Sequence, residues 1–269
     1  MLQDAIASLQ QAGIAAAARE AALIIEAAQR IEPGNWVQAA NAMIARRAAG
    51  IPLAYVTGRE TFMGLTLLTD EGALVPRAET ELLARTAIGL LAGEDRRVID
   101  MCCGSGNLAC AIAHHVRHAR VWASDLTEGC TSLARRNVAQ LGLADRVSVV
   151  QGDLFGGLAG MSLEGTIDAV VCNPPYISQG KLATDRAELL KFEPREAFDG
   201  GPYGLSIHQR VIRDTLSFLK PEGALMFEIG LGQERQVRAL FERSKGYGPV
   251  QSVSDADGNA RVVWARKAG

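Results

Sequence analysis

The chain has 269 residues, of which 48% are hydrophobic and 22% are charged, and its formal net charge is −2. This composition is typical of a globular protein with a well-filled core, and the length suits one large domain with a smaller one. A slightly acidic chain has no general attraction for a polyanion, so avid non-specific binding to nucleic acid is not expected.

Five cysteines occur in the chain, and no two of them form a Cys-x-x-Cys pair. Because this odd number lies within apolar segments, we expect reduced, buried thiols and no metal site. No apolar run approaches the length of a membrane span, and the first residues lack the basic and then apolar pattern of a signal peptide. The expected location is therefore the cytoplasm, with no membrane partner.

The first 50 residues are rich in alanine and predict a small helical domain. Leu2, Ile6 and Leu9 keep helical spacing, and a further helix is expected from about Trp36 to Ala49. A domain of this size buries little apolar surface by itself. We therefore expect it to pack on the rest of the chain or to hold a partner.

A hairpin linker is predicted for residues 51–75. Short β-prone pieces, Ala54–Gly58 and Phe62–Leu67, are separated there by glycine. The segment 76–81, Pro-Arg-Ala-Glu-Thr-Glu, then opens a helix, and acids in a first turn suit the helix dipole.

Residues 76–269 alternate strands with helices. Apolar runs predict strands near 97–100, 121–125, 147–150, 167–172 and 224–228, with helices at 107–115, 128–141 and 208–219. A polar insertion, 178–204, follows the fourth strand, and residues 251–266 predict a closing pair of strands. This order predicts an α/β fold, a doubly wound parallel sheet with an antiparallel edge hairpin.

The fourth strand ends in Asn173-Pro174-Pro175-Tyr176. Prolines cannot donate to a sheet ladder and fix their own φ, so this loop is stiff, and open α/β sheets hold their ligands at such strand ends. The Asn173 side-chain oxygen and the Pro174 carbonyl can accept the two hydrogens of an –NH2 group, with Tyr176 stacking on its planar carrier. The alternative is a rigid turn without a ligand.

A glycine turn, Gly104-Ser105-Gly106, joins the first of these strands to a helix, so its backbone can approach a ligand closely. Asp100 ends that strand, while Asp125 and Asp153 close the next two, where they suit ribose hydroxyls and an adenine amino group. Dinucleotide-binding enzymes share such a turn, but Asp100 would repel a pyrophosphate and suits an amino-acid ammonium. The set predicts S-adenosylmethionine, with helix N-caps as the alternative for each acid.

The methyl donor and the –NH2 clamp fit one reaction. An amide or ring-conjugated nitrogen is a poor nucleophile because its lone pair is delocalised. Hydrogen bonds from both its hydrogens to Asn173 and Pro174 would orient the lone pair toward the sulfonium methyl and favour positive charge on nitrogen. No strong general base is required, because the proton becomes acidic only as the methyl arrives.

From about residue 20 to the C-terminus, the chain resembles the release factor glutamine methyltransferases. The motifs that carry the resemblance are 52–58, 76–81, 173–177, Phe192-Glu193-Pro194 and Asp199-Gly200-Gly201. Asn-Pro-Pro-Tyr alone is shared with adenine and guanine amino methyltransferases, whereas the motif at 76–81 together with Phe-Glu-Pro is far more specific. The resemblance implies a Rossmann-like class I methyltransferase domain over 76–269 and a helical substrate-recognition domain over 1–50.

The resemblance also implies the reaction and its residues. The donor would be S-adenosylmethionine, the product S-adenosylhomocysteine, and the partner a class I peptide chain release factor, methylated on the glutamine of its Gly-Gly-Gln motif. The implied donor-binding residues are Asp100, Cys102, Cys103, Gly104, Ser105, Gly106, Asp125, Asp153, Leu154 and Asn173. The implied substrate-binding residues are Arg77, Glu81, Asn173, Pro174, Pro175 and Tyr176, with Asn173, Pro174 and Tyr176 as the catalytic group.

Three positions depart from the family pattern. Cys102 stands where the family has glycine, Cys103 where it often has threonine, and Ala78 where it often has proline. A Cβ atom at 102 would crowd a turn that needs positive φ or close approach of a ligand. These departures leave open a paralogue with another amide-bearing substrate, an amino methyltransferase of adenine or guanine in nucleic acid, or a non-catalytic binding module.

Overall fold

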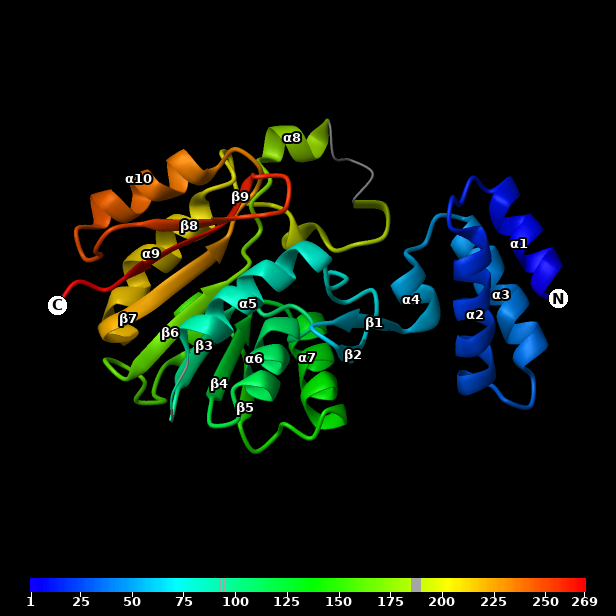
Figure 1. The fold of residues 1–269 in the computed structure, drawn as a ribbon, viewed down its shortest axis with the longest axis horizontal. Helices are drawn as coiled ribbons and strands as arrows, with labels where there is room; N and C mark the ends of the chain where they lie inside the picture. Colours follow the sequence, from blue (N-terminus) through cyan, green and yellow to red (C-terminus); the bar gives the residue numbers. More distant parts are fainter. Residues whose placement is uncertain (92, 94, 185–189) are drawn as a thin grey trace. The chain divides into compact units, whose positions relative to one another are not determined.

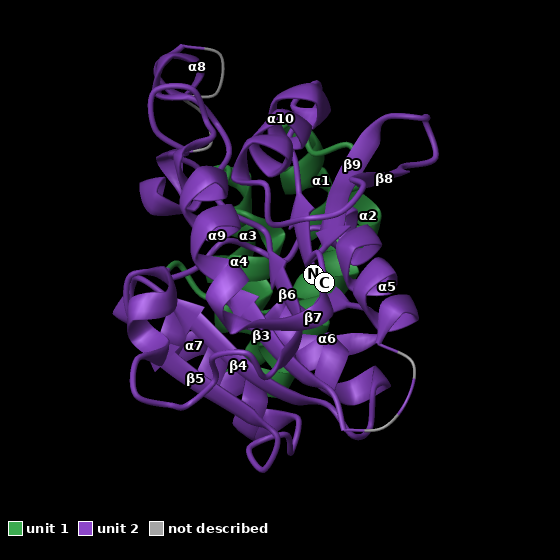
Figure 2. Cartoon of the chain, turned by 90° about the vertical axis from the view of Figure 1, so that its left-hand side faces the viewer, with its two compact units in different colours: residues 1–60, 68–71 green, residues 61–67, 72–269 purple. Residues whose placement is uncertain are grey.

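The computed structural model describes residues 1–91, 93, 95–184 and 190–269, so that 185–189 of the polar insertion lie outside the described residues. The chain divides into two compact units: Met1–Glu60 with Leu68–Glu71, and Thr61–Leu67 with Gly72–Gly269 (Figure 2). No helix among the described residues is long and apolar enough to cross a membrane.

The smaller unit contains the helices α1 (Leu2–Gln11), α2 (Ala17–Ile31) and α3 (Trp36–Ala48) (Figure 1). Leu9, Ile24 and Ile44 are buried in its core. Arg47 reaches from α3 to Glu20 on α2, with Nε donating to the carboxylate at 2.6 Å. The helical character expected from the alanine-rich sequence is therefore present, with alanines allowing the helices to pack closely.

The β-prone interpretation of Ala54–Gly58 is wrong, because Leu53–Thr57 forms a short helix, α4. Pro52 precedes it with φ −50°, and Gly58 ends it in the left-handed conformation, with φ 73°. Thr57 Oγ1 donates back to the Leu53 carbonyl at 3.0 Å. Two strands, β1 (Arg59–Phe62) and β2 (Leu65–Leu68), then form the expected hairpin.

A seven-stranded sheet forms the larger unit and confirms the predicted fold class. Its order is β5-β4-β3-β6-β7-β9-β8, with β9 antiparallel to both β7 and β8 and the other pairs parallel. The strands are β3 (Arg97–Met101), β4 (Arg120–Asp125), β5 (Val147–Gln151), β6 (Ile167–Cys172), β7 (Leu219–Glu228), β8 (Gln251–Ser254) and β9 (Ala260–Arg266).

Helices cover both faces of this sheet (Figure 1). One core contains residues of α5, α6 and α7, and the other contains residues of α9 and α10. Neighbouring strand residues such as Val170 and Val171 belong to opposite cores, as the alternation of side chains in a strand requires. The helices are α5 (Glu81–Leu90), α6 (Asn107–His115), α7 (Glu128–Gln140), α8 (Gln179–Ala183), α9 (Ser206–Phe218) and α10 (Glu234–Ser244), with 3-10 turns η1 (Ala78–Thr80), η2 (Leu154–Leu158) and η4 (Arg195–Ala197).

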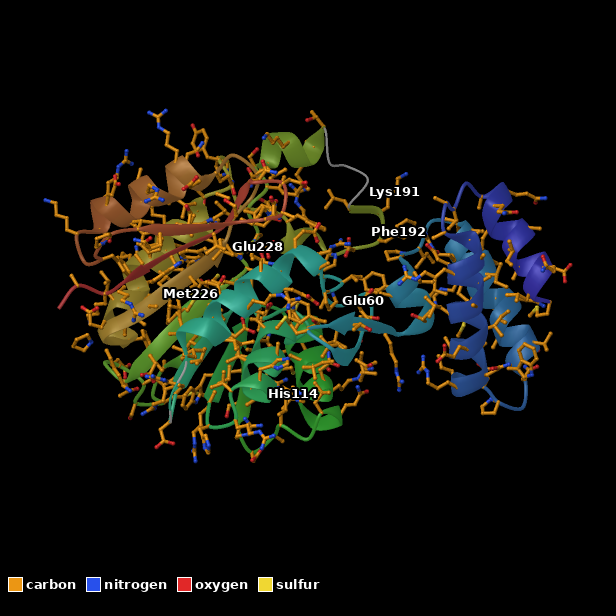
Figure 3. All side chains as sticks on the ribbon, in the orientation of Figure 1. Glu60, His114, Lys191, Phe192, Met226 and Glu228 are labelled. Atoms are coloured by element: carbon orange, nitrogen blue, oxygen red, sulfur yellow. The ribbon has the colours of Figure 1, made fainter. Side chains whose placement is uncertain are left out.

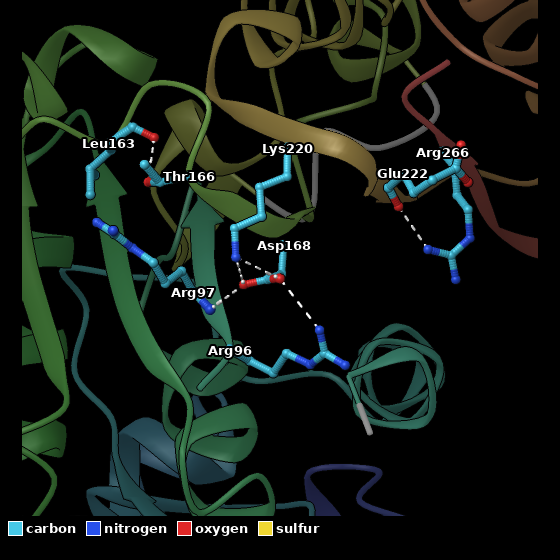
Figure 4. A network of polar contacts seen from close by, with 8 residues as sticks. All are labelled: Arg96, Arg97, Leu163, Thr166, Asp168, Lys220, Glu222 and Arg266. Carbon is cyan, nitrogen blue, oxygen red and sulfur yellow. Dashed lines mark hydrogen bonds and ion pairs between the residues drawn. The ribbon is translucent and has the colours of Figure 1, made fainter. Parts of the chain in front are cut away.

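Asp168, the acid inside the otherwise apolar strand β6, is neutralised at the amino-terminal side of the sheet (Figure 4). Lys220 Nζ lies 3.1 Å from its Oδ1, and the Arg97 backbone amide donates to Oδ2 at 2.8 Å. Arg96 adds an ion pair at 3.4 Å. This cluster anchors β3, β6 and β7 at one end, while the residues predicted to bind ligands lie at the other.

Candidate active site

A cavity opens at the carboxyl ends of β3, β4 and β6 and encloses about 990 Å³ with its open mouth included. The predicted site residues that line it are Arg77, Cys102, Cys103, Gly104, Ser105, Asp125, Asp153, Leu154, Asn173 and Pro175. The structure therefore brings residues of the predicted donor loop and of the Asn-Pro-Pro-Tyr turn together in the lining of the same cavity.

The glycine turn after β3 takes the left-handed backbone conformation at three positions: Cys102 (φ 61°), Gly104 (φ 53°) and Gly106 (φ 77°). A Cβ atom at Gly106 would lie 3.1 Å from the Ala134 Cβ, so this glycine allows the turn to pack against α7. Cys102 adopts positive φ despite its side chain, at a cost of about 1–2 kcal/mol. The positive φ that was expected at position 102 is thus present, although a cysteine occupies it.

Asp125 shapes this turn directly. Its Oδ2 accepts from the Gly104 backbone amide at 2.9 Å, and its Oδ1 accepts from the Thr127 amide at 3.2 Å. A carboxylate oxygen has two lone-pair sites, so both oxygens can accept further hydrogen bonds from a ligand in the cavity. Asp125 therefore both holds the loop and presents acceptors where ribose hydroxyls were expected.

Asp100 is fully buried in β3. Its Oδ2 accepts from the Ala109 amide in the first turn of α6 at 2.9 Å, whereas its Oδ1 has no hydrogen-bond partner among the described residues. Burial raises the pKa of Asp100 to about 8, the charge of Asp125 adds to the rise, and the Ala109 hydrogen bond opposes it. A buried acid with one uncommitted oxygen beside a cavity fits a cationic ligand group, and S-adenosylmethionine carries both an ammonium and a sulfonium.

Asp153 has a partner that the sequence did not indicate. Arg210 of α9 donates to its Oδ2 at 2.7 Å, and 59% of the Asp153 side chain is exposed. The residue still lines the cavity, together with Leu154. Its expected role toward an adenine amino group stays a prediction, in which Arg210 competes for the carboxylate.

Asn173 leaves β6 at the cavity wall, and its amide orientation is fixed by a residue of η1. Its Nδ2 donates to the Thr80 hydroxyl at 3.1 Å. Because the nitrogen is engaged there, the Oδ1 acceptor is left for another donor. This is the orientation that the expected –NH2 clamp needs.

Tyr176 is held on the other side of the turn. Its hydroxyl donates to Glu228 Oε1 at 3.4 Å, and its backbone carbonyl accepts from Gln233 Nε2 at 2.9 Å. Burial, followed by the neighbouring Glu228 charge, raises the pKa of Tyr176 to about 12, so the phenol is neutral at pH 7. Sequence reasoning missed Thr80, Glu228 and Gln233 as partners, although Thr80 lies inside the motif at 76–81.

The two family-specific motifs meet beside the cavity. Arg77 donates to Glu193 Oε2 at 2.5 Å, and Glu193 Oε1 accepts from the Val75 amide at 3.2 Å. Glu81, also predicted to bind substrate, instead accepts from the Met63 amide at 2.8 Å and pairs with Arg85. Arg77 is therefore at the site, whereas Glu81 serves the hairpin and α5.

Of the remaining predicted residues, Pro174, Tyr176, Gly106 and Asp100 adjoin the lining residues along the chain without lining the cavity themselves. Two nearby cysteines, Cys103 and Cys172, do not supply a nucleophile. Burial raises the pKa of Cys103 and of Cys172, so both thiols stay protonated at neutral pH. The site thus offers hydrogen-bond acceptors and shape, which suits a transfer driven by positioning.

Known proteins resemble this chain in sequence and in structure. The Methyltransferase small domain family matches residues 78–195. The release factor glutamine methyltransferase of Moorella thermoacetica is 37% identical over 82% of this chain and 77% of its own length. That of Corynebacterium glutamicum is 32% identical over 99% of this chain and 97% of its own length.

Two further matches carry names that mention other molecules. The ribosomal protein uL3 glutamine methyltransferase of Bradyrhizobium diazoefficiens is 34% identical over 79% of this chain and 66% of its own length. Among solved structures, the catalytic domain of hMettl16 in complex with a MAT2A 3'UTR hairpin has a TM-score of 0.57 at 19% identity, covering 83% of this chain and 81% of that one. This last likeness is one of fold.

Proposed function

The chain belongs to the family of release factor glutamine methyltransferases, and from this membership we propose that it transfers the methyl group of S-adenosylmethionine to the side-chain amide nitrogen of the glutamine in the Gly-Gly-Gln motif of class I peptide chain release factors. The observation that carries the proposal is the orientation of Asn173. The Asn173 side-chain nitrogen donates to Thr80, so the side-chain oxygen of this cavity-lining residue is the atom left to accept a hydrogen bond. The enzyme would work in the cytoplasm beside its substrate.

Asn173 Oδ1 and the Pro174 carbonyl each accept one hydrogen of the glutamine –NH2 group in this proposal. Pro175 follows Pro174 and restricts the Pro174 ψ to extended values, so the direction of the Pro174 carbonyl is limited. Two such bonds hold the amide plane and orient the nitrogen lone pair toward the reacting methyl. Because both acceptors stabilise positive charge as it develops on nitrogen, they act more strongly in the transition state than in the ground state.

S-adenosylmethionine supplies the electrophilic methyl group when it is bound. On the protein side, the Gly104–Gly106 backbone, Asp125 and the buried Asp100 are the residues that hold it, with acceptors for ribose and for a cationic group. Leu154 and Leu126 add apolar surface to the same cavity. The Tyr176 hydroxyl donates to Glu228 and stays neutral, and the side chain supplies a flat, partly buried ring beside the amide.

The helical unit, Met1–Glu60 with Leu68–Glu71, is proposed as the part that holds the release factor. Its exposed apolar side chains include Leu2, Leu23, Ile31 and Val37. Exposed apolar residues of this size on a small helical unit suit a protein surface better than a polyanion. Full-length similarity to the Corynebacterium glutamicum relative includes this unit, which supports a shared role.

A methyl-transfer assay with tritiated donor tests the proposal. A class I release factor, ribosomal protein uL3, tRNA, rRNA and DNA are offered in parallel to the purified full-length protein. We expect label in the release factor alone, and no label when its Gly-Gly-Gln glutamine is replaced by alanine. Label in uL3 or in nucleic acid, with none in the release factor, would overturn the proposal in favour of that substrate.

A further inference from the structure

The two polar side chains of the Asn-Pro-Pro-Tyr turn, Asn173 and Tyr176, are both connected by polar contacts to the buried carboxylate of Glu228. Tyr176 reaches Glu228 directly, with its hydroxyl donating to Oε1 at 3.4 Å. Asn173 reaches it through Thr80, whose hydroxyl accepts from the Asn173 amide and also interacts with the Glu228 carboxylate. Glu228 lies at the end of β7 (Figure 3), 52 residues beyond Tyr176 in the chain.

Thr80 and Glu228 are almost completely enclosed, with 1% and 2% of their surfaces exposed. A buried hydroxyl that accepts from an amide must send its own proton to another acceptor. The lone pair of an amide nitrogen is delocalised into its carbonyl group, so the Asn173 nitrogen does not act as that acceptor. The Glu228 carboxylate interacts with Thr80, and this favours the Thr80 hydroxyl as the acceptor of the Asn173 amide.

The charge around Glu228 supports the same direction. Arg261 on β9 lies 3.9 Å from Oε1, with 12% of its side chain exposed, and it favours the ionised carboxylate. The negative charge of Glu79 in η1 opposes the effect of Arg261 and favours the protonated Glu228 carboxyl. Burial raises the pKa of Glu228, while Thr80 and Arg261 hold that rise in check. The Oε2 atom has no hydrogen-bond partner among the described residues, which leaves this oxygen able to accept a hydrogen bond.

We propose that Thr80 and Glu228 are positioning residues that orient Asn173 and Tyr176 together and so set the acceptor geometry for the substrate –NH2 group. This inference rests on the proposed transfer to an amide nitrogen. Without the Thr80 hydroxyl, the Asn173 amide loses the hydrogen bond that selects one of its two orientations. A rotation by 180° would then exchange Oδ1 with Nδ2 and present the Asn173 –NH2 to the substrate –NH2. Two donors would then face one another, and the substrate amide would lose its acceptor.

Kinetics on matched variants test the positioning role. Thr80→Val replaces the hydroxyl by a methyl group of similar volume, Thr80→Ser keeps the hydroxyl, and Glu228→Gln keeps the shape without the charge. Thr86→Val is the control, because Thr86 lies on α5 and donates only to the Leu82 carbonyl, at 2.7 Å. We expect Thr80→Val to lower kcat about 10- to 100-fold, as expected for a lost positioning hydrogen bond.

The expected pattern separates positioning from folding. Donor Kd, measured by titration calorimetry, and KM for the release factor should stay within about twofold of wild type in every variant. Thr80→Ser should recover most of kcat, and Glu228→Gln should lose it in part. Wild-type kcat in Thr80→Val, or equal losses in Thr80→Val and Thr86→Val, would overturn the proposal.

The NMR signal of the Asn173 side-chain amide tests the positioning role of Thr80 independently of the proposed substrate. In a ¹⁵N–¹H spectrum of the wild-type protein, the Asn173 side-chain amide pair is assigned by its loss in Asn173→Asp. We expect Thr80→Val to shift this pair and to speed its hydrogen exchange, with no such change in Thr86→Val. An unchanged Asn173 pair in Thr80→Val would contradict the relay, whereas an unlabelled release factor with a shifted pair would contradict only the proposed substrate.

Discussion

Binding of the methyl donor should release a proton from Asp100. Burial raises the pKa of this side chain to about 8, so about nine in ten molecules carry the proton at pH 7. Its Oδ1 has no partner among the described residues, and a nearby ammonium would favour the ionised form. If the pKa falls below about 6 in the complex, donor binding at pH 7 releases about 0.8 to 0.9 proton.

Titration calorimetry in two buffers measures this release. The apparent enthalpy of donor binding in phosphate and in Tris, both at pH 7, should differ by the released fraction times the difference between the buffers' ionisation enthalpies. S-adenosylhomocysteine keeps the ammonium and lacks the sulfonium charge, so it should release the same fraction. Asp100→Asn should remove the difference. Equal enthalpies in the two buffers for the wild-type protein would refute the assignment of Asp100 to a cationic group.

The same shift predicts how the stability of the ligand-free protein depends on pH. Between the ordinary pKa of 3.8 and the folded value of about 8, the native state keeps the Asp100 proton that the unfolded state has lost. The free energy of unfolding therefore falls as pH rises through this window, by up to about 1.4 kcal/mol per pH unit. Burial lowers the pKa of His208 to about 4, so its contribution to the free energy of unfolding rises with pH between 4 and its ordinary pKa of 6.5. The free energy of unfolding in urea is measured against pH for the wild-type protein and for Asp100→Asn. The difference between the two curves gives the contribution of the Asp100 carboxyl.

Three further substitutions test the remaining parts of the site. Asn173→Ala should lower kcat by at least about 100-fold, because an acceptor of the transition-state charge is lost, with donor Kd unchanged by calorimetry; substantial turnover would contradict the amide clamp. Asp125→Ala should weaken donor binding about 10- to 100-fold, since a charged acceptor and a support of the Gly104 amide are both removed; unchanged donor affinity would remove its ribose role. Cys102→Gly should raise the free energy of unfolding by up to about 1 kcal/mol in urea, because glycine relieves the positive φ; lower stability would mean that sulfur packing outweighs the backbone strain.

The strands of the sheet could be predicted because each is a short, continuous apolar run, buried on both faces by helices. Helix α10 gave no such signal: of its residues only Val237 and Phe241 are buried, and most of the others are charged or polar. The short helix α4 was missed for the opposite reason. Its residues favour strands locally, but a proline before it and a left-handed glycine after it impose one helical turn.

The acids of the site could be located from the sequence because they end successive strands, whereas their partners could not. Thr80 and Asn173 are 93 residues apart, and Asp153 and Arg210 are 57 apart. No local pattern specifies such pairs, since they depend on which helix packs over which strand end. The exposed Asp153 therefore looked equivalent to the buried Asp100, although one has an arginine partner and the other keeps an oxygen free.

The proposed clamp of the Asn-Pro-Pro-Tyr turn would hold an –NH2 group, but a planar amine on a base and one on an amide present the same two hydrogens. Substrate choice must therefore come from what surrounds the turn. Arg77 and Glu193, from the two family-specific motifs, form a salt bridge of 2.5 Å at the cavity, and Glu193 also accepts from the Val75 amide. This bridge joins the segment before η1 to the segment before η4, so both motifs form one wall. Because long-range pairing builds this wall beside the proposed clamp, we expect substrate choice to depend on the motifs that flank the clamp, and Arg77→Ala should change it more than it changes donor binding.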